Sequence, residues 1–95
     1  MAPPERPDLY VVARILDALW HRDEPLLRTH LQVASNVNYD IFVRYLEWMQ
    51  GRRLVALEDG PDGHVRVSLT PDGREAYRKI VSWINEVVRG RPPGS

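Results

Sequence analysis

Apolar residues recur at helical spacing from Leu9 onward and form one stripe along the first predicted helix. The helix is expected to cover about residues 9–22, with Asp8 as its N-cap. It ends before Pro25, because proline disfavours helix at the residue that precedes it. The residues of the stripe are Leu9, Val12, Ala13, Leu16, Leu19 and Trp20.

Two shorter helical patterns follow, separated by a polar turn. The second helix covers about residues 28–35, and three apolar residues in or next to it are expected to face inward: Leu27, Leu31 and Ala34. Residues 35–38 read as a tight turn with one buried anchor, Val37. This spacing predicts two helices held at a fixed angle by a short connection.

The third helix is predicted over residues 39–50, with Asn38 as its N-cap. Gly51 is expected to take the left-handed conformation that closes many helices. The inward face of this helix consists of Phe42, Tyr45, Leu46 and Met49. The opposite face is therefore predicted to be open to solvent or to a ligand.

The next pattern has the period of β-structure. Residues 54–58 and 64–69 form two short runs, and the second alternates apolar and polar positions. The segment between them, Asp-Gly-Pro-Asp-Gly, favours a hairpin turn. Leu26 and Leu27 are predicted to form one very short strand.

A fourth helix is predicted over residues 71–89, with Thr70 as its cap and Pro71 in its first position. Its apolar positions are too many for a single narrow stripe: Tyr77, Ile80, Val81, Trp83, Ile84, Val87 and Val88. Residues 1–7 and 90–95 are expected to be frayed ends around one domain over residues 8–89.

The succession of helix, short strand, two helices, hairpin and helix resembles the winged helix-turn-helix fold, a mainly α class with a small β-hairpin. Residues 31–55, LQVASNVNYDIFVRYLEWMQGRRLV, look like its helix-turn-helix and first wing strand. Residues 65–77, VRVSLTPDGREAY, resemble its closing segment. The combination is most similar to small archaeal winged-helix regulators. Two features depart from the pattern: Arg53 stands where a glycine usually precedes the wing strand, and the hairpin is acidic.

The resemblance implies a function in binding double-stranded DNA, with the third helix in the major groove and the hairpin as the wing. Its implied contact residues on that helix are Asn38, Tyr39 and Arg44, beside Asp40 and Glu47, which would repel phosphate. Further candidates for phosphate or groove contacts are Arg28, Thr29, His30, Arg52, Arg53 and Arg66. Three of these have simpler interpretations that stay open: Thr29 as a helix cap, Arg28 as a solvated side chain, and Arg66 as the cross-strand partner of Glu58.

The wide apolar surface of the fourth helix suggests a homodimer. The residues assigned to that interface are Tyr10, Tyr77, Ile80, Trp83, Ile84, Val87 and Val88, with Val11 and Ile15 adding to it. In the opposing interpretation, all of these residues are buried in the core of a single domain. His64 is expected to be a surface residue, and Arg74 is expected to pair with nearby acids.

Composition narrows the possible functions. The chain of 95 residues has 43% hydrophobic residues and no cysteine, so one domain is expected, without disulfides or thiolate metal sites. Its thirteen basic and thirteen acidic residues give no net charge that would indicate a nucleic-acid ligand. The alternative function is therefore a winged-helix protein-interaction module that does not bind DNA. No enzyme motif, cofactor or small-molecule ligand is evident, and a cytoplasmic location is expected.

Overall fold

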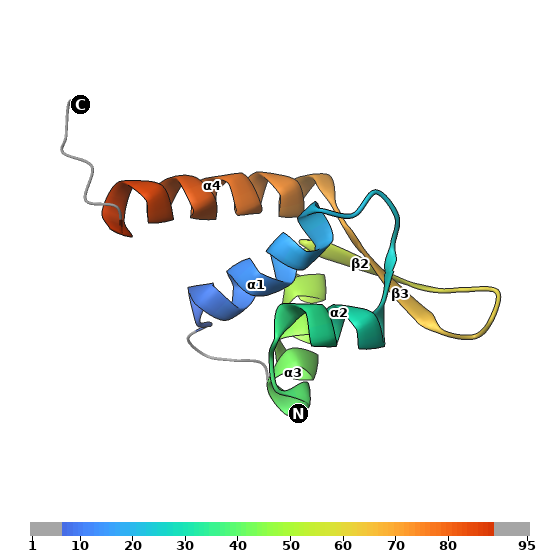
Figure 1. The fold of residues 1–95 in the computed structure, drawn as a ribbon. Coiled ribbons are helices and arrows are strands. Elements are labelled where there is room, and N and C mark those ends of the chain that lie inside the picture. The colour runs from blue at the N-terminus through green and yellow to red at the C-terminus, as the bar shows by residue number, and fades with distance from the viewer. Residues whose placement is uncertain (1–6, 89–95) are drawn as a thin grey trace.

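The computed structural model describes residues 7–88, which form four helices and one small antiparallel sheet (Figure 1). The helices are α1 (Leu9–Trp20), α2 (Arg28–Ser35), α3 (Tyr39–Gly51) and α4 (Pro71–Val88). The strands are β1 (Leu26–Leu27), β2 (Val55–Asp59) and β3 (Val65–Leu69), and β3 lies at the centre of the sheet. The predicted order of elements is confirmed. The expected frayed ends lie outside the described residues, apart from Pro7.

Two caps that the sequence predicted fix the starts of α1 and α3. The Asp8 carboxylate accepts the Tyr10 backbone N–H at 2.8 Å, and the Asn38 side chain accepts the Asp40 N–H at 2.9 Å. Each cap satisfies an amide that has no partner within its helix. The helix boundaries follow the prediction closely, although α1 ends at Trp20, two residues earlier than expected.

The core lies where α1, α2 and α3 meet β3. Its largest fully buried side chains are Phe42, Ile15, Leu16, Leu31 and Met49. The four predicted inward residues of α3 are all buried, which confirms that face. Burying such side chains supplies most of the stability of a domain this small.

Two predictions of which residues face the core were wrong. Ile15, expected outside the domain core, is completely buried, because α1 packs against α2, α4 and β3 and therefore buries a wider face than one stripe. In α2 the buried residues are Leu31, as predicted, and Ser35, whereas Ala34 is exposed. The Ser35 hydroxyl donates to the Leu31 carbonyl at 2.7 Å, so this polar group is satisfied inside the core.

The end of α3 also corrects the sequence analysis. The left-handed residue is Arg53, with φ 62°, while Gly51 is the last residue of the helix. The Leu54 N–H donates to the Met49 carbonyl at 2.9 Å, and the Arg53 N–H donates to the Gln50 carbonyl at 3.0 Å. These bonds form a Schellman motif, in which the left-handed position is usually glycine. The glycine missing before the wing strand is thus replaced by a strained arginine.

We therefore expect both Arg53→Gly and Gly51→Ala to stabilise the protein. The first relieves left-handed strain of about 1 kcal/mol. The second replaces a helical glycine by the better helix former, worth about 0.5 kcal/mol, and its new Cβ meets no atom within 4 Å. Urea unfolding should show a higher midpoint for each variant with an unchanged slope. A lower urea midpoint for Arg53→Gly would contradict the interpretation that Arg53 is strained in its left-handed conformation.

The junction between α3 and α4 explains the Leu-Thr-Pro-x-Gly motif. The Thr70 hydroxyl lies 2.6 Å from the Arg53 carbonyl and 3.0 Å from the Leu54 carbonyl, and it accepts the Gly73 N–H at 2.9 Å. Gly73 is buried, and an added Cβ would overlap the backbone oxygen of Leu54. Glycine is required here because α4 starts directly against the backbone that leads into β2.

Candidate nucleic-acid interface

The start of α2 lies beside the wing. Strand β1 pairs with β3 in the register Leu26 with Val67 and Leu27 with Arg66. This pairing creates a hollow of about 180 Å³, lined by Leu27, Arg28, Thr29, His64 and Val65. The structure therefore brings together the first residues of α2 and the first residues of β3. This proximity was hard to predict from the sequence, because it depends on a strand of only two residues.

The N-terminus of α2 has no side-chain cap. Its N-cap residue is Leu27, which cannot accept a hydrogen bond through its side chain, so the suggestion that Thr29 caps the helix was wrong. Arg28, Thr29 and His30 are all exposed. Helix N-termini with free amide groups favour anions, and a phosphate group is a suitable ligand for such a position.

The exposed face of α3 carries mixed charge. Tyr39, Asp40 and Glu47 are exposed, while Arg44 is partly buried. Asn38 uses its side-chain oxygen to cap the helix, so this oxygen has a structural partner. Tyr39 is the most open aromatic side chain on this helix, with 57% of its surface exposed.

Two arginines follow α3, and each is held in place. The Arg52 guanidinium lies over the ring of Trp48, with its carbon 5.4 Å from the ring centroid. At this distance the electron-rich face of the ring attracts the positive charge. Arg53 is exposed, and its backbone is fixed by the Schellman motif and by Thr70. Both cations are therefore positioned at the C-terminal end of α3.

The wing extends away from the helices (Figure 1), and its strands carry both acidic and basic side chains. In the hairpin register Glu58 lies opposite Arg66, as expected, but the two do not form the ion pair that was considered. Arg66 instead binds Asp62, with Nη1–Oδ1 and Nη2–Oδ2 distances of 2.9 and 3.1 Å. The turn residue is the better partner because both oxygens of its carboxylate reach the guanidinium.

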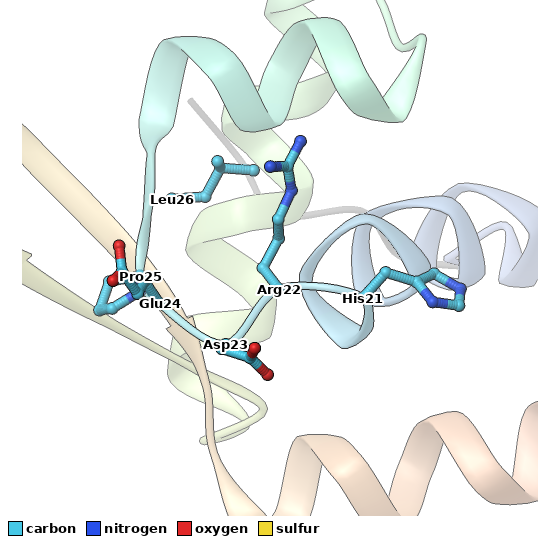
Figure 2. Close-up of a pocket in the computed structure, with 6 residues that line it drawn as sticks. All are labelled: His21, Arg22, Asp23, Glu24, Pro25 and Leu26. Atoms are coloured by element: carbon cyan, nitrogen blue, oxygen red, sulfur yellow. The ribbon is translucent and has the colours of Figure 1, made fainter.

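A second hollow, of about 370 Å³, lies along the loop between α1 and β1 and is lined by residues 21–26. Figure 2 shows that Arg22 and Asp23 point to opposite sides of the loop, while the ring of His21 points away from both. No set of polar groups converges in this hollow. Within residues 7–88, no group of three or more histidine and carboxylate side chains is placed to hold a metal ion.

On the other side of the domain, α1 and α4 meet at an aromatic contact. The rings of Trp20 and Tyr77 have centroids 4.8 Å apart, and the Tyr77 hydroxyl donates to Asp17. Burial, together with that hydrogen bond, raises the pKa of Tyr77 to about 12. Arg74 lies over the ring of Trp20 rather than beside an acid, which corrects the expectation for this residue. Tyr77 therefore makes its contacts within the domain, to Trp20 and Asp17.

The rest of α4 is divided between the core and an open surface. Ile80 packs against the core, whereas Trp83 and Val87 are 52% and 56% exposed. Tyr10, at the start of α1, is 62% exposed, and Figure 1 shows the start of α1 and the end of α4 on the same side of the molecule. The residues of this apolar face are Tyr10, Trp83, Ile84 and Val87. The domain core therefore does not bury all the residues assigned to the interface. The side chain of Val88 lies outside the described part of the structure.

No described helix has the length and apolarity needed to cross a membrane. No family model matches the chain, and a comparison with curated proteins found no match. Solved structures do match. F93 from STIV, described as a winged-helix DNA-binding protein, is 16% identical with a TM-score of 0.77, over 87% of this chain and 96% of that chain.

Two longer proteins are also similar. BpsR of Bordetella bronchiseptica, whose DNA binding is regulated by 6-hydroxynicotinic acid, is 20% identical with a TM-score of 0.75, over 98% of this chain and 67% of that chain. A MarR family regulator from Silicibacter pomeroyi is 25% identical with a TM-score of 0.69, and the shares are 88% and 60%. The present chain therefore spans nearly all of F93 and about two thirds or less of these regulators. Together with the order of its elements, these likenesses establish that the chain has the winged helix-turn-helix fold.

Proposed function

We propose that the protein binds double-stranded DNA as a homodimer and acts as a transcriptional regulator. In this proposal the exposed face of α3 enters the major groove, and the start of α2 contacts a phosphate group. The observation that carries the proposal is the uncapped N-terminus of α2, with Arg28 and Thr29 exposed beside the wing. The named DNA-binding functions of proteins with the same fold support it.

The proposed contacts divide into two groups. Arg28, Thr29, His30, Arg52 and Arg53 are suited to phosphate, because they lie at helix ends and carry positive charge or hydrogen-bond donors. Tyr39 and Arg44 are suited to base edges in the major groove. Asn38 contributes through the helix start that it caps, and Arg66 is considered separately below.

A direct titration tests the proposal. Anisotropy of a labelled random-sequence duplex should report binding that weakens steeply as salt rises, because each phosphate contact releases a counterion. Arg28→Ala and Arg52→Ala should each weaken binding and lower the salt slope by about 0.9. Lys79→Ala is the matched control, since it removes one exposed positive charge from α4, distant from the start of α3. Absence of binding to any duplex at low salt would refute the proposal.

A second candidate function is a protein-interaction module without DNA binding. The observation that favours it is the acidic wing, where Glu58 and Asp59 are exposed and Arg66 is already paired. It predicts that the arginine variants above retain activity in a reporter assay, whereas substitutions in the apolar face of α1 and α4 abolish it. Parallel measurement of both sets of variants separates the two functions.

The proposed homodimer uses the apolar face defined by Tyr10, Trp83, Ile84 and Val87. A two-fold pairing of this face covers three side chains that are more than half exposed in one copy, those of Tyr10, Trp83 and Val87, and it requires only a self-complementary surface. Tyr77 and Ile80, which the sequence assigned to the same interface, contribute by supporting α4 from within the domain. A symmetric pair also presents two copies of α3 to successive turns of the duplex.

A further inference from the structure

The tip of the wing is built around the guanidinium of Arg66. Both oxygens of Asp62 bind its two terminal nitrogens, and one of them also accepts the His64 backbone N–H at 3.1 Å. Gly60 leaves space for this group, because an added Cβ would overlap Nη1 of Arg66. The turn therefore holds the carboxylate in the position where the arginine needs it.

This contact removes the positive charge from the wing. A guanidinium bound by two parallel hydrogen bonds to a carboxylate is neutralised as a pair. The side-chain hydrogen bond from Arg66, followed by the backbone hydrogen bond from His64, holds the pKa of Asp62 well below its usual range. The pair therefore remains ionised in mild acid. The other charged residues of the two wing strands, Glu58 and Asp59, are acidic and exposed.

We propose that Asp62 is an intramolecular competitor for DNA phosphate, which occupies Arg66 and makes the wing autoinhibitory. This inference rests on the proposed DNA-binding function. A carboxylate and a phosphate group present equivalent pairs of oxygens to a guanidinium, so they compete for the edge of Arg66 formed by Nη1 and Nη2. In the wild-type protein, a bidentate contact between this edge of Arg66 and a DNA phosphate requires loss of the existing pair with Asp62. When the Asp62 charge is removed, Arg66 can bind a DNA phosphate without first losing an ion pair.

The decisive variant is Asp62→Asn. Asparagine retains an oxygen for the His64 N–H, so the turn is preserved while the ion pair is lost. Asp59→Asn is the matched control, because it removes the same charge from the neighbouring end of β2, where no bond to Arg66 exists. Asp62→Ser, which also keeps an acceptor, replaces Asp62→Asn if thermal unfolding shows that the asparagine variant is not folded.

We expect Asp62→Asn to tighten binding to a random-sequence duplex at least about threefold more than Asp59→Asn, and to steepen the salt slope by about 0.9. In an Arg66→Ala background the two variants should have equal effects. Equal effects in the wild-type background, or an excess that persists without Arg66, would overturn the inference while leaving DNA binding intact. If no variant binds any duplex, the proposed function itself fails, and the competitor role fails with it.

Discussion

Gly73→Ala is expected to destabilise the fold by about 3 kcal/mol, because its new methyl group would overlap backbone that is held in place. The new Cβ would overlap the carbonyl oxygen of Leu54 and lie 2.8 Å from a methyl carbon of Leu69. The backbone oxygen cannot move aside, because it also accepts the Thr70 N–H at 3.2 Å. Relief therefore requires α4 to move away from the start of β2.

Thermal unfolding measures this effect directly. For a domain of this size a loss of about 3 kcal/mol lowers the midpoint by roughly 15 °C. Gly51→Ala provides the matched control, because it adds the same methyl group to a glycine in open space and should raise the midpoint. A Gly73→Ala variant as stable as the wild type would show that α4 can leave its position against Leu54 without cost.

Trp83→Asp is expected to convert the proposed homodimer into a monomer. A buried, unpaired carboxylate is strongly unfavourable, and two-fold symmetry places it in the interface twice. The domain itself should stay folded, because Trp83 is 52% exposed and lies beyond the residues that pack against the core. Sedimentation at micromolar concentration should give twice the chain mass of 11.0 kDa for the wild type and a single chain mass for the variant.

Loss of the dimer should also weaken binding to a duplex with two half-sites by about 100-fold, because the second contact no longer benefits from the first. Val33→Asp is the control for sedimentation, since Val33 is an exposed apolar residue on α2 and lies outside the proposed interface. It should remain dimeric. A monomeric wild type, or a dimeric Trp83→Asp variant, would contradict the arrangement.

Local rules in the sequence were sufficient for most of the fold. Helix caps act over three residues and strand alternation over five, so Asp8, Asn38, Thr70 and the hairpin were identified without tertiary information. The errors occurred where a distant segment decides the outcome. Ile15 is buried because three elements, α2, α4 and β3, pack against α1. The spacing of apolar residues within one helix does not indicate how many other elements pack against it.

The candidate site was less predictable for two physical reasons. Arg53 was not expected in a left-handed conformation, because glycine is preferred there and Gly51 lies only two residues away. Arg66 was expected to contact DNA, with a cross-strand pair to Glu58 as the alternative, but the turn residue Asp62 offers it both oxygens. The hollow that joins Arg28 to His64 depends on the pairing of β1 with β3, which two leucines alone indicate only weakly.

The Thr70 hydroxyl hydrogen-bonds to the backbone that follows α3 and to the first turn of α4, so the end of α3 is connected directly to the start of α4. In a symmetric pair held through α4, a small rotation at the contact between the copies would change the tilt of α3 at the far end of each domain. The distance between the two α3 helices, and with it the preferred spacing of half-sites, would then be set by the side chains that separate the paired copies of α4.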